Sequence, residues 1–94
     1  MDKRVVWSAR ALGDVESIAA YISSDSPAYA KIVVKKILKL TRQLRQFPNL
    51  GREVPEFQDQ TLREIFAYSY RIIYKVEEKE IIIASVIHGK RNLL

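Results

Sequence analysis

The spacing of apolar residues changes once along this chain, and that change limits the folds open to it. Between about residue 9 and about residue 46, apolar side chains recur every three or four positions, which is the period of an amphipathic helix. From Leu62 onward they alternate with polar side chains or run continuously, as they do in strands. Because 94 residues allow a single domain, the helical half must pack on the sheet that the second half forms.

The helical half predicts two helices joined by a short turn, and therefore an antiparallel hairpin. The first helix spans roughly Ala9 to Ser23, after an N-cap hydroxyl at Ser8. The second spans about Pro27 to Gln46, with Ser26 as its cap and a proline in the first helical position. The residues predicted to be buried are Leu12, Val15, Ile18, Ala19 and Ile22 in the first helix, and Ala30, Val33, Val34, Ile37, Leu38, Thr41 and Leu44 in the second.

Strand patterns occur at both ends of the chain. Residues Arg4 to Trp7 form a short apolar run, and three longer runs follow the helices and the loop FPNLGREVPEF: LREIFAYS, YRIIYKV and IIIASVI. In YRIIYKV, Arg71, Ile73 and Lys75 alternate with the remaining positions, so we expect one covered face and one exposed face. IIIASVI is apolar nearly throughout, as in a central strand covered on both faces. The expected fold class is α+β in the order β-α-α-β-β-β.

In this fold the helical hairpin packs on one face of a small, mainly antiparallel sheet. A first strand placed beside the last one would close that sheet. The order of the runs is compatible with this pairing, but the sequence does not prove it.

Composition removes several classes of function. The chain has no cysteine, which excludes disulfides, thiolate metal sites and thiol nucleophiles. A single histidine leaves only a carboxylate cage for a metal, so we expect no metal site and no cofactor. No apolar stretch has the length of a membrane span, and the N-terminal MDKRVVW lacks the apolar run of a signal peptide. We therefore expect a cytoplasmic protein that does not enter a membrane.

The charge of the chain is basic and unevenly placed. The formal net charge is +5 and the isoelectric point is about 9.6, which suits an anionic partner such as nucleic acid, a ribosome or an acidic protein. No acidic residue occurs between Asp25 and Glu53, where lysines and arginines are frequent. The predicted basic face of the second helix consists of Lys35, Lys36, Lys39, Arg42 and Arg45. The alternative interpretation of this pattern is an ordinary solvated helix face.

Four segments, taken in order, resemble the RelE/ParE superfamily of type II toxin–antitoxin toxins, and its ParE-like or plasmid-stabilisation branch in particular. They are VVWSARALGDVESIAAYI, FPNLGREVPEF, LREI followed by YRIIYKV, and ASVIHGKR, and the match runs from Val6 to the C-terminus. The resemblance implies one RelE/ParE-like toxin domain over residues 1–94 that inhibits growth. It also implies neutralisation by a small cognate antitoxin, acidic and partly disordered when free, in a toxin–antitoxin hetero-oligomer.

The superfamily divides by target. RelE-like members cut mRNA on the ribosome without a metal, whereas ParE-like members poison DNA gyrase. Cutting RNA requires a base, an acid and a cation near the phosphate. Compared with the RelE-like subset that resembles YoeB, Glu56 matches the carboxylate base, Arg71 the phosphate-binding arginine and His88 the acid. Gly89 stands where that subset has an aromatic residue, and the ending HGKR is common in ParE-like sequences.

The resemblance therefore favours gyrase poisoning, which requires no enzymatic chemistry from the chain. A ribosome-dependent mRNA endonuclease and an inactive, degenerate toxin are the alternatives. The candidate target-binding residues are Arg52, Arg63, Arg71, Lys90 and Arg91.

Each candidate residue also has a structural interpretation. Glu56 could pair with Arg52 or Arg63, and Arg71 could anchor Glu53 or Glu64. Aromatic side chains could stack on bases or could simply fill the core. The aromatic candidates are Trp7, Tyr68, Tyr70 and Tyr74, of which the tyrosines would share one face if they lay on one continuous strand.

Overall fold

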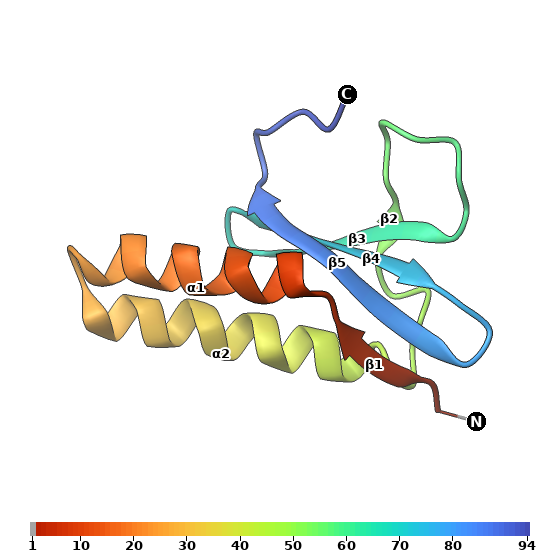
Figure 1. The fold of residues 1–94 in the computed structure, drawn as a ribbon, viewed down its shortest axis with the longest axis horizontal. Helices are drawn as coiled ribbons and strands as arrows, with labels where there is room; N and C mark the ends of the chain where they lie inside the picture. Colours follow the sequence, from red (N-terminus) through yellow and green to blue (C-terminus); the bar gives the residue numbers. More distant parts are fainter. Residues whose placement is uncertain (1) are drawn as a thin grey trace.

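Two helices cover one face of a five-stranded mixed sheet (Figure 1). The structure is a computed structural model and describes residues 2–94. Its elements are β1 (Arg4–Trp7), α1 (Ala9–Ser23), α2 (Pro27–Gln43), β2 (Arg52–Glu53), β3 (Leu62–Ala67), β4 (Tyr70–Val76) and β5 (Glu80–His88). The predicted order β-α-α-β-β-β is confirmed, with the two-residue strand β2 as an addition that the sequence pattern did not indicate.

The strands lie in the order β1-β5-β4-β3-β2. Neighbouring strands are antiparallel except β1 and β5, which run parallel with Arg4 opposite Glu80 and Trp7 opposite Ile83. The expected place of the first strand beside the last is therefore confirmed. Lys3 links the start of the chain to the β4–β5 turn, because its ammonium group donates to two backbone carbonyls of that turn at 2.6 and 2.9 Å.

Both predicted helix caps are present. The hydroxyl of Ser8 accepts from the backbone N–H of Ala11 at 3.0 Å, and that of Ser26 accepts from Tyr29 at 3.1 Å. Each hydroxyl satisfies one of the backbone donors that a helix start leaves unpaired. α2 ends at Gln43, three residues earlier than predicted, because residues 44–46 continue as turns.

The main core lies between the helical hairpin and the sheet. It contains Ala11, Ile22, Ala30, Val33, Ile37, Leu40 and Leu44 from the helical half and Ala67, Ile72, Tyr74, Ile81, Ile83 and Val86 from the sheet. Two predictions of buried residues were wrong, because Leu12 is 51% exposed and Leu38 is 39% exposed. The buried stripes run through Ala11 and Leu40 instead, so these leucines lie on the flank of each helix, turned away from the sheet.

The opposite face of the sheet is also covered, although neither helix of residues 2–94 lies on it. Arg71 and Ile73 in β4 are 4% and 5% exposed, so the predicted exposed face is wrong at these two positions, whereas Lys75 is exposed as predicted. The segment that connects β2 to β3 and the C-terminal tail, defined as residues 89–94, fold over this face and rise side by side from the sheet (Figure 1). They make β4 a strand buried on both sides at its centre.

Candidate functional site

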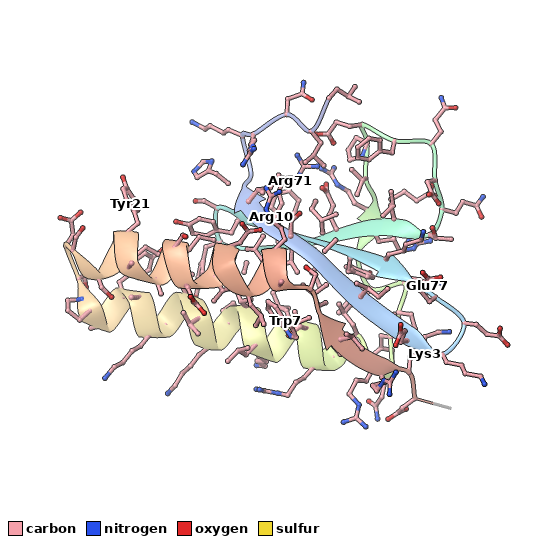
Figure 2. All side chains as sticks on the ribbon, in the orientation of Figure 1. Lys3, Trp7, Arg10, Tyr21, Arg71 and Glu77 are labelled. Atoms are coloured by element: carbon pink, nitrogen blue, oxygen red, sulfur yellow. The ribbon has the colours of Figure 1, made fainter. Side chains whose placement is uncertain are left out.

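The side chain of Arg71 lies at the centre of a buried ionic network beneath the C-terminal tail (Figure 2). Its Nε donates to Oε1 of Glu64 at 2.7 Å, and Nη2 contacts the same oxygen. Nη1 and Nη2 donate to the two carboxylate oxygens of Glu56 at 2.9 and 2.8 Å. Nη1 also donates to the backbone carbonyl of Arg91 at 2.9 Å. Four of the five N–H groups of the guanidinium are thus hydrogen-bonded, and Nη2 makes a further ionic contact with Glu64.

Two further residues complete this network. Oε2 of Glu64 accepts from Nε of Arg52 at 2.7 Å, and Oε2 of Glu56 accepts from the backbone N–H of Leu93 at 3.2 Å. Two carboxylates therefore face two guanidinium groups, and the formal charges cancel. Such compensation is what allows charged side chains to be buried.

The network shifts the titration of its members. Hydrogen bonds from Arg71, and to a lesser degree from the backbone N–H of Leu93, lower the pKa of Glu56 to about 2. Hydrogen bonds with Glu56, followed by those with Glu64, raise the pKa of Arg71 above its usual value. Glu56 is consequently ionised at neutral pH and serves as a hydrogen-bond acceptor. A carboxylate with so low a pKa is a weak general base.

His88 does not join this network. It lies opposite Tyr70 in the β4–β5 ladder, while Arg71 lies opposite Ile87. Because successive residues of a strand point to opposite faces, the side chains of His88 and Arg71 are on different sides of the sheet. The His88 ring stands edge-on to Tyr70, with ring centres 5.9 Å apart, and Nδ1 accepts from the backbone N–H of Lys90. The structure brings two of the three candidate nuclease residues together and separates the third.

Exposed tyrosines surround the side of His88 that faces α1. Tyr21 is 76% exposed and points away from the hairpin (Figure 2), and it lines a pocket of about 380 Å³ with Tyr70 and His88. Tyr29 and Tyr68 approach with ring centres 6.3 Å apart. Tyr68 has φ 54°, a left-handed conformation unusual for a side chain of this size. An aromatic surface of this kind can bind a protein or stack on bases.

The predicted arrangement of aromatic residues is only partly correct. The chain turns at Tyr68 and Ser69, so Tyr68 does not share a continuous strand with Tyr70 and Tyr74. Tyr74 is fully buried, and its hydroxyl accepts from the backbone N–H of Gly51 and donates to the carbonyl of Pro48. Trp7 packs against the main core. The rings of Trp7 and Tyr74 are therefore structural.

Comparison with known proteins identifies the family to which this chain belongs. The sequence model of the family described as "ParE toxin of type II toxin-antitoxin system, parDE" matches residues 5–93. The chain belongs to the ParE toxin family. The family assignment agrees with the resemblance carried by the four sequence segments, and it makes the chain a type II toxin of the RelE/ParE superfamily.

Two relatives and one solved structure are similar to this ParE-family chain. Protein Y4kP of Sinorhizobium fredii is 32% identical over 93 residues, covering 96% of this chain and 92% of the relative. Toxin RelE2 of Caulobacter vibrioides is 32% identical over 89 residues, covering 94% and 97%. The fold matches the chromosomal ParDE toxin–antitoxin system from P. aeruginosa with a TM-score of 0.76 and 22% identity, covering 94% of this chain and 97% of the other.

The candidate target-binding residues of the ParE-family chain differ in their availability. Lys90 and Arg91 are exposed at the start of the tail. The Arg52 side chain is 61% exposed, although it pairs with Glu64, and its guanidinium lies 5.5 Å from the centre of the Phe66 ring. Arg63 is half-buried and donates to the backbone carbonyl of Gly51. Arg71 is buried and makes four hydrogen bonds within the protein.

The predicted basic face of α2 is largely present on the surface of the ParE-family chain. Its members Lys35, Lys39, Arg42 and Arg45 are exposed, whereas Lys36 is half-buried. Within residues 2–94 there is no grouping of three or more His, Asp or Glu side chains that could hold a metal ion. The same part of the chain has no helix that is long and apolar enough to span a bilayer.

Sequence reasoning missed the tail as a component of the site. Glu64 was anticipated as one partner of Arg71, but Glu56 pairs with Arg71 and with neither Arg52 nor Arg63. The contacts of the tail use backbone atoms, so no side-chain pattern in the last residues could indicate them.

Proposed function

We propose that this chain inhibits growth as the toxin of a toxin–antitoxin pair, and that it acts by binding DNA gyrase. The single observation on which the choice of target rests is that the guanidinium of Arg71 is already hydrogen-bonded within the protein. In an RNA-cleaving site this arginine would contact the scissile phosphate, but here two carboxylates and the backbone carbonyl of Arg91 accept four hydrogen bonds from it, and Nη2 also contacts Glu64. His88, the acid of such a site, lies on the other face of the sheet. These positions favour a toxin that works by binding.

The basic surface of α2 suggests how an antitoxin is bound. Near the turn between α1 and α2 a groove of about 340 Å³ has an apolar lining that includes Ala19, Ala30 and Val34, and Lys31 and Lys35 stand beside it. An amphipathic antitoxin segment with acidic residues would place its apolar side in this groove and its carboxylates against the lysines. The antitoxin would order on binding and form a hetero-oligomer with the toxin.

Brief induction of the chain in a bacterial host tests the choice of target. We expect growth arrest with filamentation and DNA-damage signalling, no new RNA 5′ ends, and inhibition of purified gyrase in a supercoiling assay. New 5′ ends at fixed positions within codons, lost in Glu56→Gln and His88→Ala but retained in Glu53→Gln, would establish an mRNA endonuclease and overturn the proposal. Normal growth despite accumulation of folded protein would identify a degenerate toxin.

Calorimetric titration with the cognate antitoxin tests the groove. The double variant Lys31→Glu, Lys35→Glu should weaken binding by at least about tenfold at low salt, equivalent to about 1.4 kcal/mol. The double variant Lys75→Glu, Lys79→Glu, which reverses two exposed lysines that do not line the groove, serves as the matched control for net charge. Equal weakening by both sets of changes would show that general charge, and not the groove, determines affinity.

A further inference from the structure

The C-terminal tail is held in place although it has no secondary structure. The backbone N–H of Gly89 donates to the carbonyl of Ser69 at 2.6 Å, which fixes the tail to the β3–β4 turn. The carbonyl of Arg91 accepts from Arg71, and the N–H of Leu93 donates to Glu56. Chain ends are ordinarily mobile unless they are tied down. Here three different parts of the fold hold six residues.

Glu56 and Arg71 are suited to this task by their own pairing. Their two-point contact occupies both carboxylate oxygens and both terminal nitrogens of the guanidinium. The second N–H of Nη1 donates to the carbonyl of Arg91, and a second acceptor site on Oε2 accepts from the N–H of Leu93. The pair thus offers a donor and an acceptor that fit the main chain two residues apart, whatever side chains the tail carries.

The attachment determines where the cationic side chains of the tail lie. Lys90 and Arg91 are exposed, and they line a cleft of about 320 Å³ together with Arg52, Glu56 and Arg71. Because the main chain is held at Arg91 and Leu93, the backbone positions from which the Lys90 and Arg91 side chains extend are also fixed. A surface that is already ordered loses less conformational entropy when it binds a partner. The cations also suit a partner that presents carboxylates.

We propose that Glu56 and Arg71 are positioning residues that hold the C-terminal tail so that Lys90 and Arg91 can contact an acidic surface of the toxin's protein target. This inference rests on the proposed function in one respect, because it assumes that the toxin acts by binding a protein. It assigns the carboxylate–arginine pair a role that involves no proton transfer and no contact with RNA.

NMR relaxation of the purified chain tests the attachment without reference to toxicity. In Glu56→Gln we expect the backbone order parameters of residues 91–93 to fall below about 0.6, the range of flexible backbone, while β4 and β5 keep values near about 0.85. Glu53→Gln, an exposed carboxylate in β2, should leave the tail rigid. A tail that stays equally ordered in Glu56→Gln would overturn the proposed clamp.

The link to the target is tested by comparing Glu56→Gln with a chain that ends at Gly89. Each change should raise the concentration for half-inhibition of gyrase by about tenfold, or about 1.4 kcal/mol. Combining them should add nothing, because both act through the tail. Additive losses, or a mobile tail with unchanged inhibition, would overturn the positioning role. If the wild type leaves gyrase unaffected, the proposed target fails, and the relaxation data still decide whether the clamp exists.

Discussion

Replacement of Glu64 by glutamine offers a direct measure of what the buried ionic network contributes to stability. The Glu64 side chain is fully buried and its carboxylate accepts from Arg71 and Arg52, each at 2.7 Å. Glutamine has nearly the same shape, so Glu64→Gln removes the charge without leaving a cavity. It also places an amide NH₂ against guanidinium groups that can only donate.

The expected loss of stability follows from these contacts. Both guanidinium groups stay charged, but the single oxygen of glutamine can take only one of the two carboxylate oxygen positions, so about one hydrogen bond to a charged group is lost, which contributes about 1.5–3 kcal/mol. The Arg52 side chain is 61% exposed and regains water, which makes its share the smaller. Arg71 keeps Glu56 but is buried, and its loss is uncompensated. We expect Glu64→Gln to lower the free energy of unfolding by about 2 kcal/mol.

Urea denaturation monitored by circular dichroism provides the assay, with Glu53→Gln as the matched control. The control residue is an exposed glutamate on the adjacent strand, so its change should stay within about 0.5 kcal/mol. For Glu64→Gln the midpoint should fall at constant m-value, and the melting temperature should drop by roughly 8–16 °C. Equal effects of the two substitutions would refute the reasoning, because they would mean that the network contributes no more than a surface carboxylate.

Three further predictions concern the loop, the tail and the second helix. In Gly51→Ala the new Cβ would overlap the backbone carbonyl of Glu64, and we expect a loss of about 2–4 kcal/mol in urea denaturation, whereas a smaller change than about 1 kcal/mol would contradict it. The pKa of Glu56 is lowered from 4.5 to about 2, chiefly by Arg71, so its contribution is complete above pH 4.5 and is lost as pH falls through about 2. Tail amide order followed by NMR should decline in that window, and a decline near neutral pH would exclude this carboxylate as the cause. Ser26→Ala should destabilise the chain by about 1 kcal/mol in thermal denaturation, because α2 loses its N-cap, and an unchanged melting temperature would show that the cap contributes little.

The secondary structure was predictable because its signals are local. A serine before a helical period, and a proline after Ser26, determine where α1 and α2 begin whatever the rest of the chain does. Which side of each helix is buried depends on the sheet, and this is why Leu12 and Leu38 were wrongly placed in the core. The strand β2 contains two residues, too few to create a period.

The candidate site was less predictable because it depends on segments that have no period. The alternation in β4 correctly places Arg71 and Ile73 on one face, but only the fold of the loop and the tail decides that this face is buried. The separation of His88 from Arg71 is a consequence of strand register, which pairs His88 with Tyr70. The resemblance between sequences assigned Arg71 and His88 to one site, but the pairing of β4 with β5 places their side chains on opposite faces of the sheet.

The parallel pairing of β1 with β5 also has a consequence for synthesis of the toxin. The ribosome makes β1 first and β5 last among the strands, so residues 4–7 cannot pair with the sheet until residues 80–83 have been synthesised. Contacts so distant in the sequence form late in folding, whereas the helical hairpin is built from local contacts. A nascent chain therefore has its helices early and its complete sheet only after β5 has left the ribosome. Fragments released by an interrupted ribosome lack the last strand and cannot present the finished surface.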